Sequence, residues 1–298
     1  MNRVGVLYEW EPWAARLLDT LEGRGFPVER LPADSLVVDP GRIPNCAVFV
    51  NRVNVQPAGG TDPRFVFQVL GFLEELEQHG AKILNGSRAF RAAMSKSLQA
   101  SIFAKVEVPF PVTKIVASPS RAVEISKTLE FPVIVKPNIG GSGAGVRIFD
   151  GSEELQEAVR EGLSFGVDGV GLLQEYHPPA DGLVRRIEVL DGEILYGTRQ
   201  AVMQGVFNYC AIDGCSVGGD PKGSSIESFE PPKDLAALSI RVAKEAEADV
   251  AGVEFVTSSR DGRTYAFDIN PYSNLAAPDV VGFEPHELLA DAVARRLQ

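Results

Sequence analysis

A lysine followed at once by a glycine-rich loop is the first feature of this sequence that indicates chemistry. Lys136 ends a hydrophobic run, and residues 140–145 read Gly-Gly-Ser-Gly-Ala-Gly. Glycines let backbone N–H groups close over phosphate oxygens without Cβ clashes, while the lysine adds a positive charge. The spacing fits neither a P-loop nor a dinucleotide fingerprint that opens a helix. The segment therefore predicts a phosphate site, and the alternative is a flexible hairpin loop beside a surface lysine.

Three oxygen-bearing side chains lie on two strands expected near the C-terminus. Glu254 lies on a strand expected over residues 250–257, and Asp268 and Asn270 lie on the next, over residues 264–270. Because side chains alternate along a strand, Asp268 and Asn270 share a face. Oxygen ligands of this kind suit Mg²⁺ held between a protein and a phosphate chain. The alternative is that these residues only solvate the ends of the strands.

A weaker signal lies at the end of the apolar strand expected over residues 171–176. Its last residues, Gln174, Glu175 and Tyr176, would present backbone groups to the edge of an adenine ring. Asp181 would then follow within reach of a ribose hydroxyl. Alone, this segment indicates a nucleotide only weakly.

Strands and helices alternate over the first ninety residues. The expected strands are 3–8, 28–31, 46–50 and 82–84, and the expected helices are 13–21 and 65–76. This alternation predicts a small parallel sheet of Rossmann-like type. Ligands of open α/β sheets bind at the carboxyl ends of the strands. The candidates there to contact a second substrate are Tyr8, Glu9, Asn51 and, most strongly, Arg52.

The rest of the chain combines two groups of strands with covering helices. The expected strands are 112–116, 132–136, 146–149, 171–176, 184–190, 193–199, 250–257 and 264–270. The expected helices are 94–106, 119–129, 153–161, 233–248 and one that begins at residue 285. Asp191-Gly192 is typical of a two-residue hairpin turn. We therefore expect a mixed α/β fold with several sheets.

The composition argues against several classes of protein. The chain has 298 residues, of which 45% are hydrophobic, and 40 acidic against 29 basic residues give a net charge of −11. An acidic surface disfavours nucleic acid and anionic membranes as partners. No apolar run approaches the ~18 residues that a membrane helix needs, and the first strand is too short for a secretory signal. We therefore expect a cytoplasmic protein with no nucleic-acid and no membrane partner.

The order of these features resembles the ATP-grasp superfamily over nearly the whole chain. That order is Lys96, Lys136, the glycine loop, Gln174-Glu175-Tyr176, Arg186, Arg199, Glu254 and Asp268-x-Asn270. The segments 85–88, 108–113 and 131–136 are similar to the RimK-type, glutathione-synthetase-like branch, which joins amino acids through amide bonds. The resemblance implies an ATP-grasp fold with an N-terminal Rossmann-like domain. It divides the chain into that domain at 1–92, a central lobe with a glycine-rich lid at 93–172, and a C-terminal lobe with a metal site at 173–298.

The resemblance also implies a role for each candidate residue. The residues that would bind ATP are Lys96, Lys136, Gly141, Ser142, Gly143, Gln174, Glu175, Tyr176, Asp181 and Asn208. The residues that would bind Mg²⁺, with Mn²⁺ as a substitute, are Glu254, Asp268 and Asn270. Arg186, Arg199 and Lys136 would be catalytic. The residues that would contact substrate are Arg186, Arg199 and Asn274, to which the position at the edge of the first sheet adds Arg52.

By this resemblance the chain is an ATP-dependent carboxylate–amine ligase. A carboxylate is phosphorylated to an acyl-phosphate, an amine attacks it, and an amide, ADP and phosphate result. The expected partners are an amino acid, peptide or other carboxylate plus an amine, and a homodimer is common among similar proteins. Two alternatives are a glutamate-ligase type of enzyme that tags a peptide or protein, and a non-catalytic ATP-binding regulatory protein.

Three segments depart from the family's pattern, and one of them is Val184-Arg185-Arg186, where the branch usually has Asp-x-Arg. Asp268 replaces the commoner glutamate, which shortens the reach of the carboxylate by one methylene. Residues 271–274 replace the usual glycine-containing turn where amine substrates approach. The departure at residues 271–274 leaves the acceptor amine the least defined part of the expected reaction.

Overall fold

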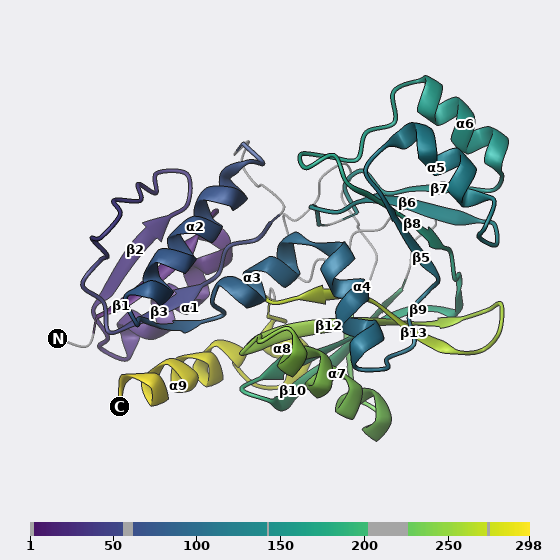
Figure 1. Ribbon diagram of the computed structural model, residues 1–298. Helices are drawn as coiled ribbons and strands as arrows, with labels where there is room; N and C mark the ends of the chain where they lie inside the picture. The colour runs from purple at the N-terminus through teal and green to yellow at the C-terminus, as the bar shows by residue number, and fades with distance from the viewer. Residues whose placement is uncertain (1–2, 56–61, 142, 202–225, 273–274) are drawn as a thin grey trace.

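The computed structural model describes residues 3–55, 62–141, 143–201, 226–272 and 275–298, which form three sheets flanked by helices (Figure 1). The mixed α/β fold expected from the sequence is confirmed. Three of the predicted site residues, Ser142, Asn208 and Asn274, lie outside the described residues.

The N-terminal unit is a parallel sheet with the strand order β2-β1-β3-β4. Its strands are β1 (Val4–Tyr8), β2 (Val28–Pro32), β3 (Val48–Asn51) and β4 (Lys82–Leu84). Two helices, α1 (Glu11–Gly23) and α2 (Phe65–Gln78), connect them. Leu17 and Leu21 recur at helical spacing in α1 and share a core with Val4 and Val6 of β1. Since all four strands are parallel, their carboxyl ends lie at one edge of the sheet.

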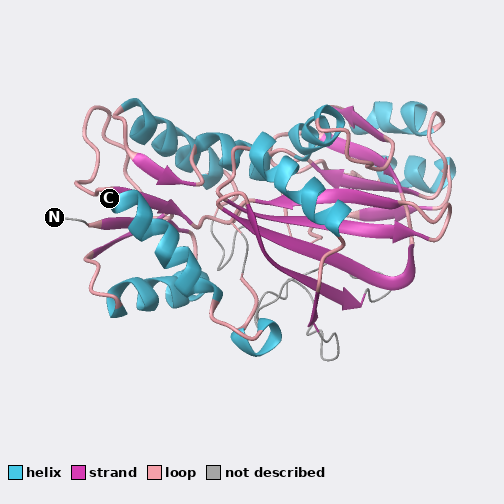
Figure 2. Cartoon of the chain, turned by 90° about the horizontal axis from the view of Figure 1, so that it is seen from below, coloured by secondary structure: helices cyan, strands magenta, loops and turns pink. Residues whose placement is uncertain are grey.

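The last helix, α9 (Pro285–Leu297), packs on this N-terminal sheet. It lies against α1 and β3, and its Leu289 and Val293 belong to the same core as Leu17. Burying an aliphatic side chain of this size contributes about 1.5–3 kcal/mol. Figures 1 and 2 show the two chain termini at the same end of the molecule as a result. The C-terminal helix thus ties the last lobe of the chain to the first unit.

The central lobe is an antiparallel sheet with the order β5-β8-β6-β7. Its strands are β5 (Thr113–Val116), β6 (Val133–Pro137), β7 (Arg147–Phe149) and β8 (Gly171–Glu175), and its helices are α5 (Pro119–Ser126) and α6 (Ser152–Arg160). Val133 and Val135 of β6 pack in a core with Leu155 of α6. Alternation along β6 therefore turns Ile134 and Lys136 to the opposite face.

The C-terminal lobe holds a larger antiparallel sheet with the order β11-β10-β9-β12-β13 (Figure 2). Its strands are β9 (Pro179–Leu190), β10 (Glu193–Ala201), β11 (Ile226–Phe229), β12 (Val250–Ser258) and β13 (Thr264–Asn270). Helix α7 (Lys233–Glu245) packs on β9 and β12, α4 (Lys96–Lys105) and α3 (Ser87–Met94) pack on β13, and α8 (Pro278–Val281) follows later in the chain. The face of this sheet away from α7 is thereby left toward the central lobe.

Most expected elements agree with the structure, and the exceptions have local causes. The hairpin turn is confirmed: Asp191 and Gly192 both have positive φ angles, 50° and 80°. The helix expected over 94–106 is α4, and it begins at Lys96 because extended Ser95 caps it and accepts a hydrogen bond from the Leu98 N–H at 3.2 Å. Strand β11 and helices α3 and α8 were not expected. No helix within the described ranges has the length and apolar character of a membrane span.

Asn85 joins the N-terminal unit to the C-terminal lobe. It is 2% exposed and has a positive φ of 61°. Its side chain donates to the Val250 carbonyl at 2.9 Å and accepts from the Val250 N–H at 3.0 Å. It also donates to the Pro271 carbonyl, and its backbone N–H donates to Asp249 at 2.7 Å. One side chain therefore satisfies buried backbone groups of two segments far apart in the sequence.

We predict that Asn85→Ala lowers the free energy of unfolding by about 2–4 kcal/mol, because it leaves buried backbone groups without partners. The measurement is urea unfolding followed by circular dichroism. As a control, Arg88→Ala removes a side chain that is 73% exposed and should change the free energy by less than about 0.5 kcal/mol. Equal stability of the two variants would contradict the assignment of Asn85 as a junction.

Candidate active site

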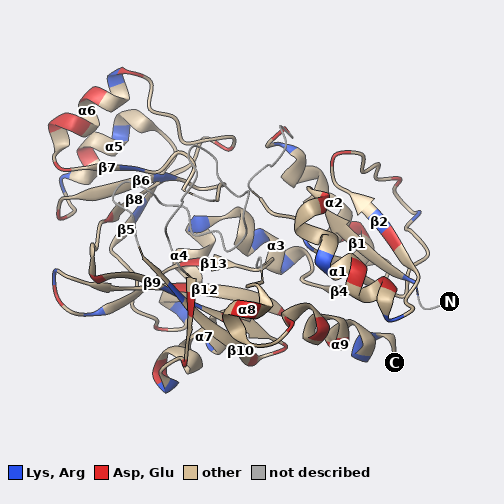
Figure 3. Ribbon diagram, turned by 180° about the vertical axis from the view of Figure 1, so that it is seen from behind, with Lys and Arg blue, Asp and Glu red and all other residues tan. Residues whose placement is uncertain are grey.

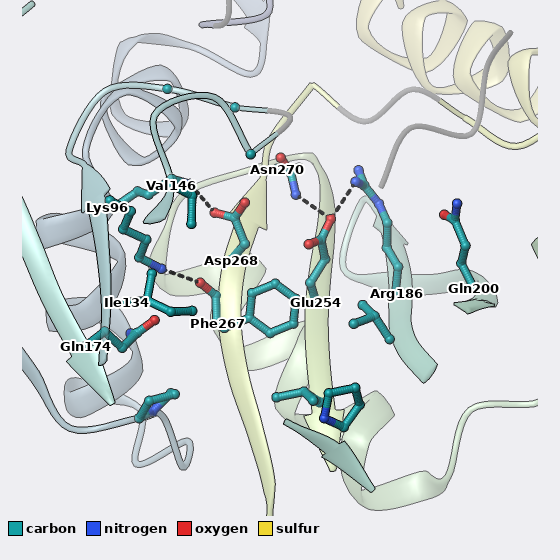
Figure 4. A pocket seen from close by; sticks show the side chains of 18 of the residues that line it. Lys96, Ile134, Val146, Gln174, Arg186, Gln200, Glu254, Phe267, Asp268 and Asn270 are labelled. Carbon is teal, nitrogen blue, oxygen red and sulfur yellow. Dashed lines mark hydrogen bonds and ion pairs between the residues drawn. The ribbon is translucent and has the colours of Figure 1, made fainter. Parts of the chain in front are cut away.

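A cavity lies between the central sheet and the C-terminal sheet (Figure 4). Side chains from both lobes and from α4 border it. Predicted site residues that line it are Lys96, Lys136, Gly141, Gly143, Gln174, Glu175, Tyr176, Arg186, Arg199, Glu254, Asp268 and Asn270. The fold thus brings together residues that span most of the sequence.

Two rows of polar side chains run across the C-terminal sheet toward this cavity. Strand pairing aligns Asp268, Glu254, Arg186 and Thr198 in one row, and Asn270, Gly252, Glu188 and Tyr196 in the next. Positions two apart on each strand share a face, which explains why both rows face the cavity. All eight residues except Gly252 line it. The period-two spacing of Asp268 and Asn270 seen in the sequence is confirmed.

Arg186 is held between two carboxylates in this array. Its Nε donates to Glu188 Oε1 at 2.6 Å and its Nη1 to Glu254 Oε1 at 2.9 Å. Burial alone would lower the pKa of Arg186, but Glu188 and Glu254 outweigh it, and the net shift is upward. Figure 3 shows acidic and basic positions side by side on β9 and β12. Arg186 is therefore a fixed positive charge at the floor of the cavity.

Gly252 makes room for this guanidinium. A Cβ atom at Gly252 would lie 2.5 Å from Arg186 Nη2 and 2.7 Å from Arg186 Cζ. Real Cβ atoms do not approach other atoms so closely, so any larger residue would displace Arg186. The Gly252-Val253-Glu254 segment therefore supplies both the space for the guanidinium and one of its carboxylate partners.

Lys96 and Lys136 face the metal-ligand candidates from the other side of the cavity. Lys96 Nζ lies 2.7 Å from Asp268 Oδ1, and Lys136 Nζ lies 3.4 Å from the Phe267 carbonyl oxygen. Burial lowers the pKa of Lys136 to about 8, and the charge of Lys96 adds to this shift. Two neighbouring ammonium groups repel one another and are stabilised by an anion. This pair suits a polyanionic ligand such as a phosphate chain.

Asn138 fixes the position of both lysines. It follows β6 directly, and its carbonyl accepts from the Lys96 N–H at 3.1 Å. Its side-chain oxygen accepts from the Ser97 N–H at 2.9 Å, and its amide donates to Asp168 at 2.7 Å. A buried asparagine therefore ties the first turn of α4, which carries Lys96, to the end of β6, which carries Lys136.

Glu254, Asp268 and Asn270 converge as the sequence predicted (Figure 4). Asn270 Nδ2 donates to Glu254 Oε1 at 3.0 Å. Burial raises the pKa of Glu254, although Arg186 opposes that shift. Among the described residues, no group of three or more His, Cys, Asp or Glu side chains forms a metal site. Two carboxylates and one amide oxygen fit a divalent cation that takes its remaining oxygens from a phosphate chain.

The end of β8 forms a further wall of the cavity. Gln174 Nε2 donates to Thr113 Oγ1 at 2.8 Å, and the Tyr176 N–H donates to the Pro132 carbonyl at 2.9 Å. His177 lines the cavity next to them, stacks on Tyr265 with ring centroids 4.2 Å apart, and lies 2.9 Å from Ser258 Oγ. These contacts make a rigid, partly aromatic wall of the kind that can hold a planar ring.

Three of the predicted site residues do not share the cavity-facing position of the others. Asp181 is exposed on β9, pairs with Arg185 and does not line the cavity. Arg199 borders the cavity, but it alternates to the face opposite Arg186 and pairs with Glu227 at 3.0 Å. Arg52 is buried behind the cavity and does not line it.

Sequence reasoning missed three positions that the structure gives a clear role. They are Glu188, which holds Arg186, Asn138, which holds both lysines, and Gly252, which makes room for the guanidinium. Glu188 could have been found from its period-two spacing to Arg186 on the same strand. Nothing in the local sequence distinguishes Asn138 from an ordinary loop residue.

A family model for the RimK-like ATP-grasp domain matches residues 93–279. This range includes the lysines, the glycine-rich loop and the three candidate metal ligands. The chain therefore belongs to the RimK-like ATP-grasp family, as the order of its motifs predicted.

Solved structures show the same fold over the whole chain. D-cycloserine synthetase DcsG matches with a TM-score of 0.73 and 17% identity, over 99% of this chain and 100% of that one. D-alanine–D-alanine ligase from Bacillus anthracis matches with a TM-score of 0.71 and 17% identity, over 100% and 97%. The ATP-grasp ligase PsnB, complexed with a phosphomimetic precursor variant, Mg and ADP, matches with a TM-score of 0.70 and 17% identity, over 100% and 99%.

We predict that Gly252→Ala lowers the free energy of unfolding by about 2–4 kcal/mol, because the added methyl group breaks the buried ion pairs of Arg186. Urea unfolding measures the change. The matched control is Gly71→Ala in α2, where an added Cβ meets nothing within 4 Å, and which should be neutral or stabilising by up to about 1 kcal/mol. If both alanines have the same effect, Gly252 has no role in placing Arg186.

Proposed function

We propose that this protein is an ATP-dependent ligase that joins a carboxylate to an amine through an acyl-phosphate. The observation that carries the proposal is the arrangement of charge around one cavity. Lys96 and Lys136 approach from one side, Glu254 and Asp268 from the other, and Arg186 lies next to Glu254. Phosphoryl transfer between two anions needs this kind of fixed positive charge and metal-binding oxygen.

The nucleotide is held across the two lobes. Lys96 and Lys136 bind its phosphates, with the glycine-rich loop at Gly141 and Gly143 closing over them. Tyr176 and its neighbours on β8 face the adenine ring. Their rigid wall, made by the contacts of Gln174 and His177, supports this part of the proposal. Asp181 as a ribose contact has the least support, because it pairs with Arg185 outside the cavity.

Mg²⁺, with Mn²⁺ as a substitute, would be held by Glu254, Asp268 and Asn270. It would neutralise the phosphate oxygens and so make the γ-phosphorus easier to attack. Asp268 pairs with Lys96 in the structure at 2.7 Å. In the loaded enzyme we expect Lys96 to turn from Asp268 to a phosphate oxygen.

The first chemical step forms the acyl-phosphate. Arg186, fixed by Glu188 and Glu254, holds the donor carboxylate beside the γ-phosphate. A carboxylate oxygen attacks the γ-phosphorus, the bond to the β,γ-bridging oxygen breaks, and ADP leaves. Lys136 stabilises the charge that develops on the transferred group.

The second step forms the amide. The amine nitrogen attacks the acyl carbon, the bond from that carbon to the phosphate oxygen breaks, and the nitrogen loses a proton. Arg186 remains beside the departing phosphate, and Arg199 is a second cation at the cavity border. Closure of the glycine-rich loop would exclude water, which otherwise hydrolyses the acyl-phosphate.

The substrates that fit best are amino acids or peptides. The names of similar structures support this class: D-cycloserine synthetase, D-alanine–D-alanine ligase and PsnB, which was solved with a precursor. Arg52 and Asn274 are proposed to contact one of the two substrates.

Hydroxylamine tests the reaction without knowledge of the natural amine. The purified protein is incubated with Mg·ATP, hydroxylamine and a panel of amino acids, peptides and other carboxylates, and ADP and hydroxamate are measured. We expect one carboxylate class to give both products in equal amounts. ADP without hydroxamate from every carboxylate would contradict the ligase and leave an ATPase. Tight ATP binding without turnover on the full panel would favour a regulatory ATP-binding protein.

In the same assay, we predict that Lys136→Ala and Asp268→Ala each lower ADP formation by at least about 100-fold, because each removes a charge that acts on the transferred phosphate. The control is Lys114→Ala, which removes an exposed lysine of β5 and should leave turnover unchanged. Circular dichroism checks that all three variants unfold cooperatively. Near-normal turnover of both active-site variants would refute these assignments.

A further inference from the structure

Two buried side chains of opposite charge lie at the carboxyl ends of neighbouring strands in the N-terminal sheet. Glu9 follows β1 and is 6% exposed, and Arg52 follows β3 and is 5% exposed. Strands β1 and β3 pair in parallel, with Leu7 beside Asn51, so both residues lie at the same edge. Ligands of parallel sheets bind at this edge.

Each of these side chains has one atom in a hydrogen bond and another without a partner. Glu9 Oε2 accepts from the Asn54 N–H at 2.7 Å, and Arg52 Nη1 donates to the Tyr272 carbonyl at 2.9 Å. Glu9 Oε1 and Arg52 Nε are buried and have no hydrogen-bond partner in the structure. Among the contacts of the described residues, none joins Glu9 to Arg52. Buried charged groups are rarely left in this state, because each missing hydrogen bond is costly.

Burial also shifts the titration of both groups. Burial raises the pKa of Glu9 to about 8, and Arg52 only partly opposes this shift. Burial lowers the pKa of Arg52 despite the charges of Glu9 and Glu188. Each group is thus short of the opposite charge that would stabilise it.

The pair lies directly behind the active-site cavity. The residue that each side chain contacts, Asn54 for Glu9 and Tyr272 for Arg52, lines that cavity. Glu188, which holds Arg186, also acts electrostatically on Arg52. Charged side chains therefore form a continuous series from the cavity to the N-terminal sheet. The series runs through Glu254, Arg186, Glu188, Arg52 and Glu9.

We propose that Glu9 and Arg52 bind the head group of a zwitterionic α-amino acid, with its ammonium on Glu9 Oε1 and its carboxylate on Arg52 Nε. A zwitterion supplies a donor and an acceptor together and adds no net charge to the buried site. The proposal rests on the ligase function and names the class of one of its two substrates. An acceptor that attacks through a side-chain amine and a donor that is activated at a side-chain carboxylate both keep this head group intact.

The test uses binding, so that it does not depend on which substrate the amino acid is. The standard L-amino acids are screened for thermal stabilisation of the full-length protein with Mg·ADP. The best one, its α-amide and its N-acetyl derivative are then titrated by calorimetry. We expect the free amino acid to bind about 10- to 100-fold more tightly than either derivative, as the loss of a charge-assisted hydrogen bond predicts.

Two variants should remove these preferences separately. Glu9→Gln, which keeps the shape of the side chain, should abolish the preference over the N-acetyl derivative and keep the preference over the α-amide. Arg52→Met should do the reverse. Glu11→Gln is the matched control, because Glu11 lies nearby but is exposed and pairs with Arg30, and it should change neither preference.

If Arg52→Met does not fold, Glu9→Gln alone decides the matter. An unchanged preference over the N-acetyl derivative in that variant would overturn the proposal and leave the pair as a structural feature bridged by water. Wild-type protein that binds no free amino acid would overturn it as well. The hydroxylamine assay separates these outcomes from failure of the ligase function, because hydroxamate still forms from other carboxylates if only the amino-acid site is wrong.

When the proposal holds, hydroxamate formation shows whether the bound amino acid is the donor or the acceptor. If Glu9→Gln lowers hydroxamate formation from that amino acid, its head group belongs to the donor. If hydroxamate formation from another donor is unchanged while ligation to the amino acid is lost, it belongs to the acceptor. Both outcomes support a site for a zwitterionic head group.

Discussion

The active-site cavity depends on ion pairs between charged side chains that the fold has largely withdrawn from water. Arg186 lies between Glu188 and Glu254, and Lys96 lies against Asp268, so that each cation contacts a carboxylate. Removing one partner of such a pair leaves a buried charge unpaired and costs several kcal/mol. The strand register that aligns these residues, and the glycine that makes room for Arg186, follow from this constraint. The same charges that need one another in the free protein are suited to bind phosphate, metal and carboxylate.

The active-site cavity lies where separate parts of the chain are held together by a few buried contacts. Asn138 ties the two lysine-bearing elements, and Asn85 ties the N-terminal unit to the C-terminal lobe. Helix α9 returns from the end of the chain to the first sheet. This arrangement brings the edge of the N-terminal sheet, with Glu9 and Arg52, behind the residues proposed to transfer phosphate. A substrate that reaches both regions would contact the first and the last parts of the sequence at once.

Local patterns in the sequence predict the candidate ligand-binding residues. They do not predict all of the residues that hold those side chains in place. Lys136 before a glycine loop, and Asp268 and Asn270 two apart on a strand, are local patterns, and the structure brings them to one cavity. Glu188 was missed although its period-two spacing to Arg186 is a local signal, because the role of this pair depends on the register with β12. The helix predicted over 94–106 is α4, and only its first boundary was misplaced, because the sequence does not show that Ser95 caps it after a separate helix that ends at Met94. Asp181 was expected near the nucleotide because it follows Tyr176 closely in the sequence. The sequence does not show that its side chain pairs with Arg185 outside the cavity.

The central claim is that the carboxylate takes the phosphoryl group before the amide forms. The most direct measurement uses a carboxylate donor labelled with ¹⁸O in both oxygens, incubated with Mg·ATP and the amine, followed by mass analysis of the released phosphate. The proposed chemistry predicts one ¹⁸O atom in each phosphate released, because the acyl–oxygen bond breaks when the amine attacks. Amide formation with unlabelled phosphate would contradict an acyl-phosphate and require a different route for activation.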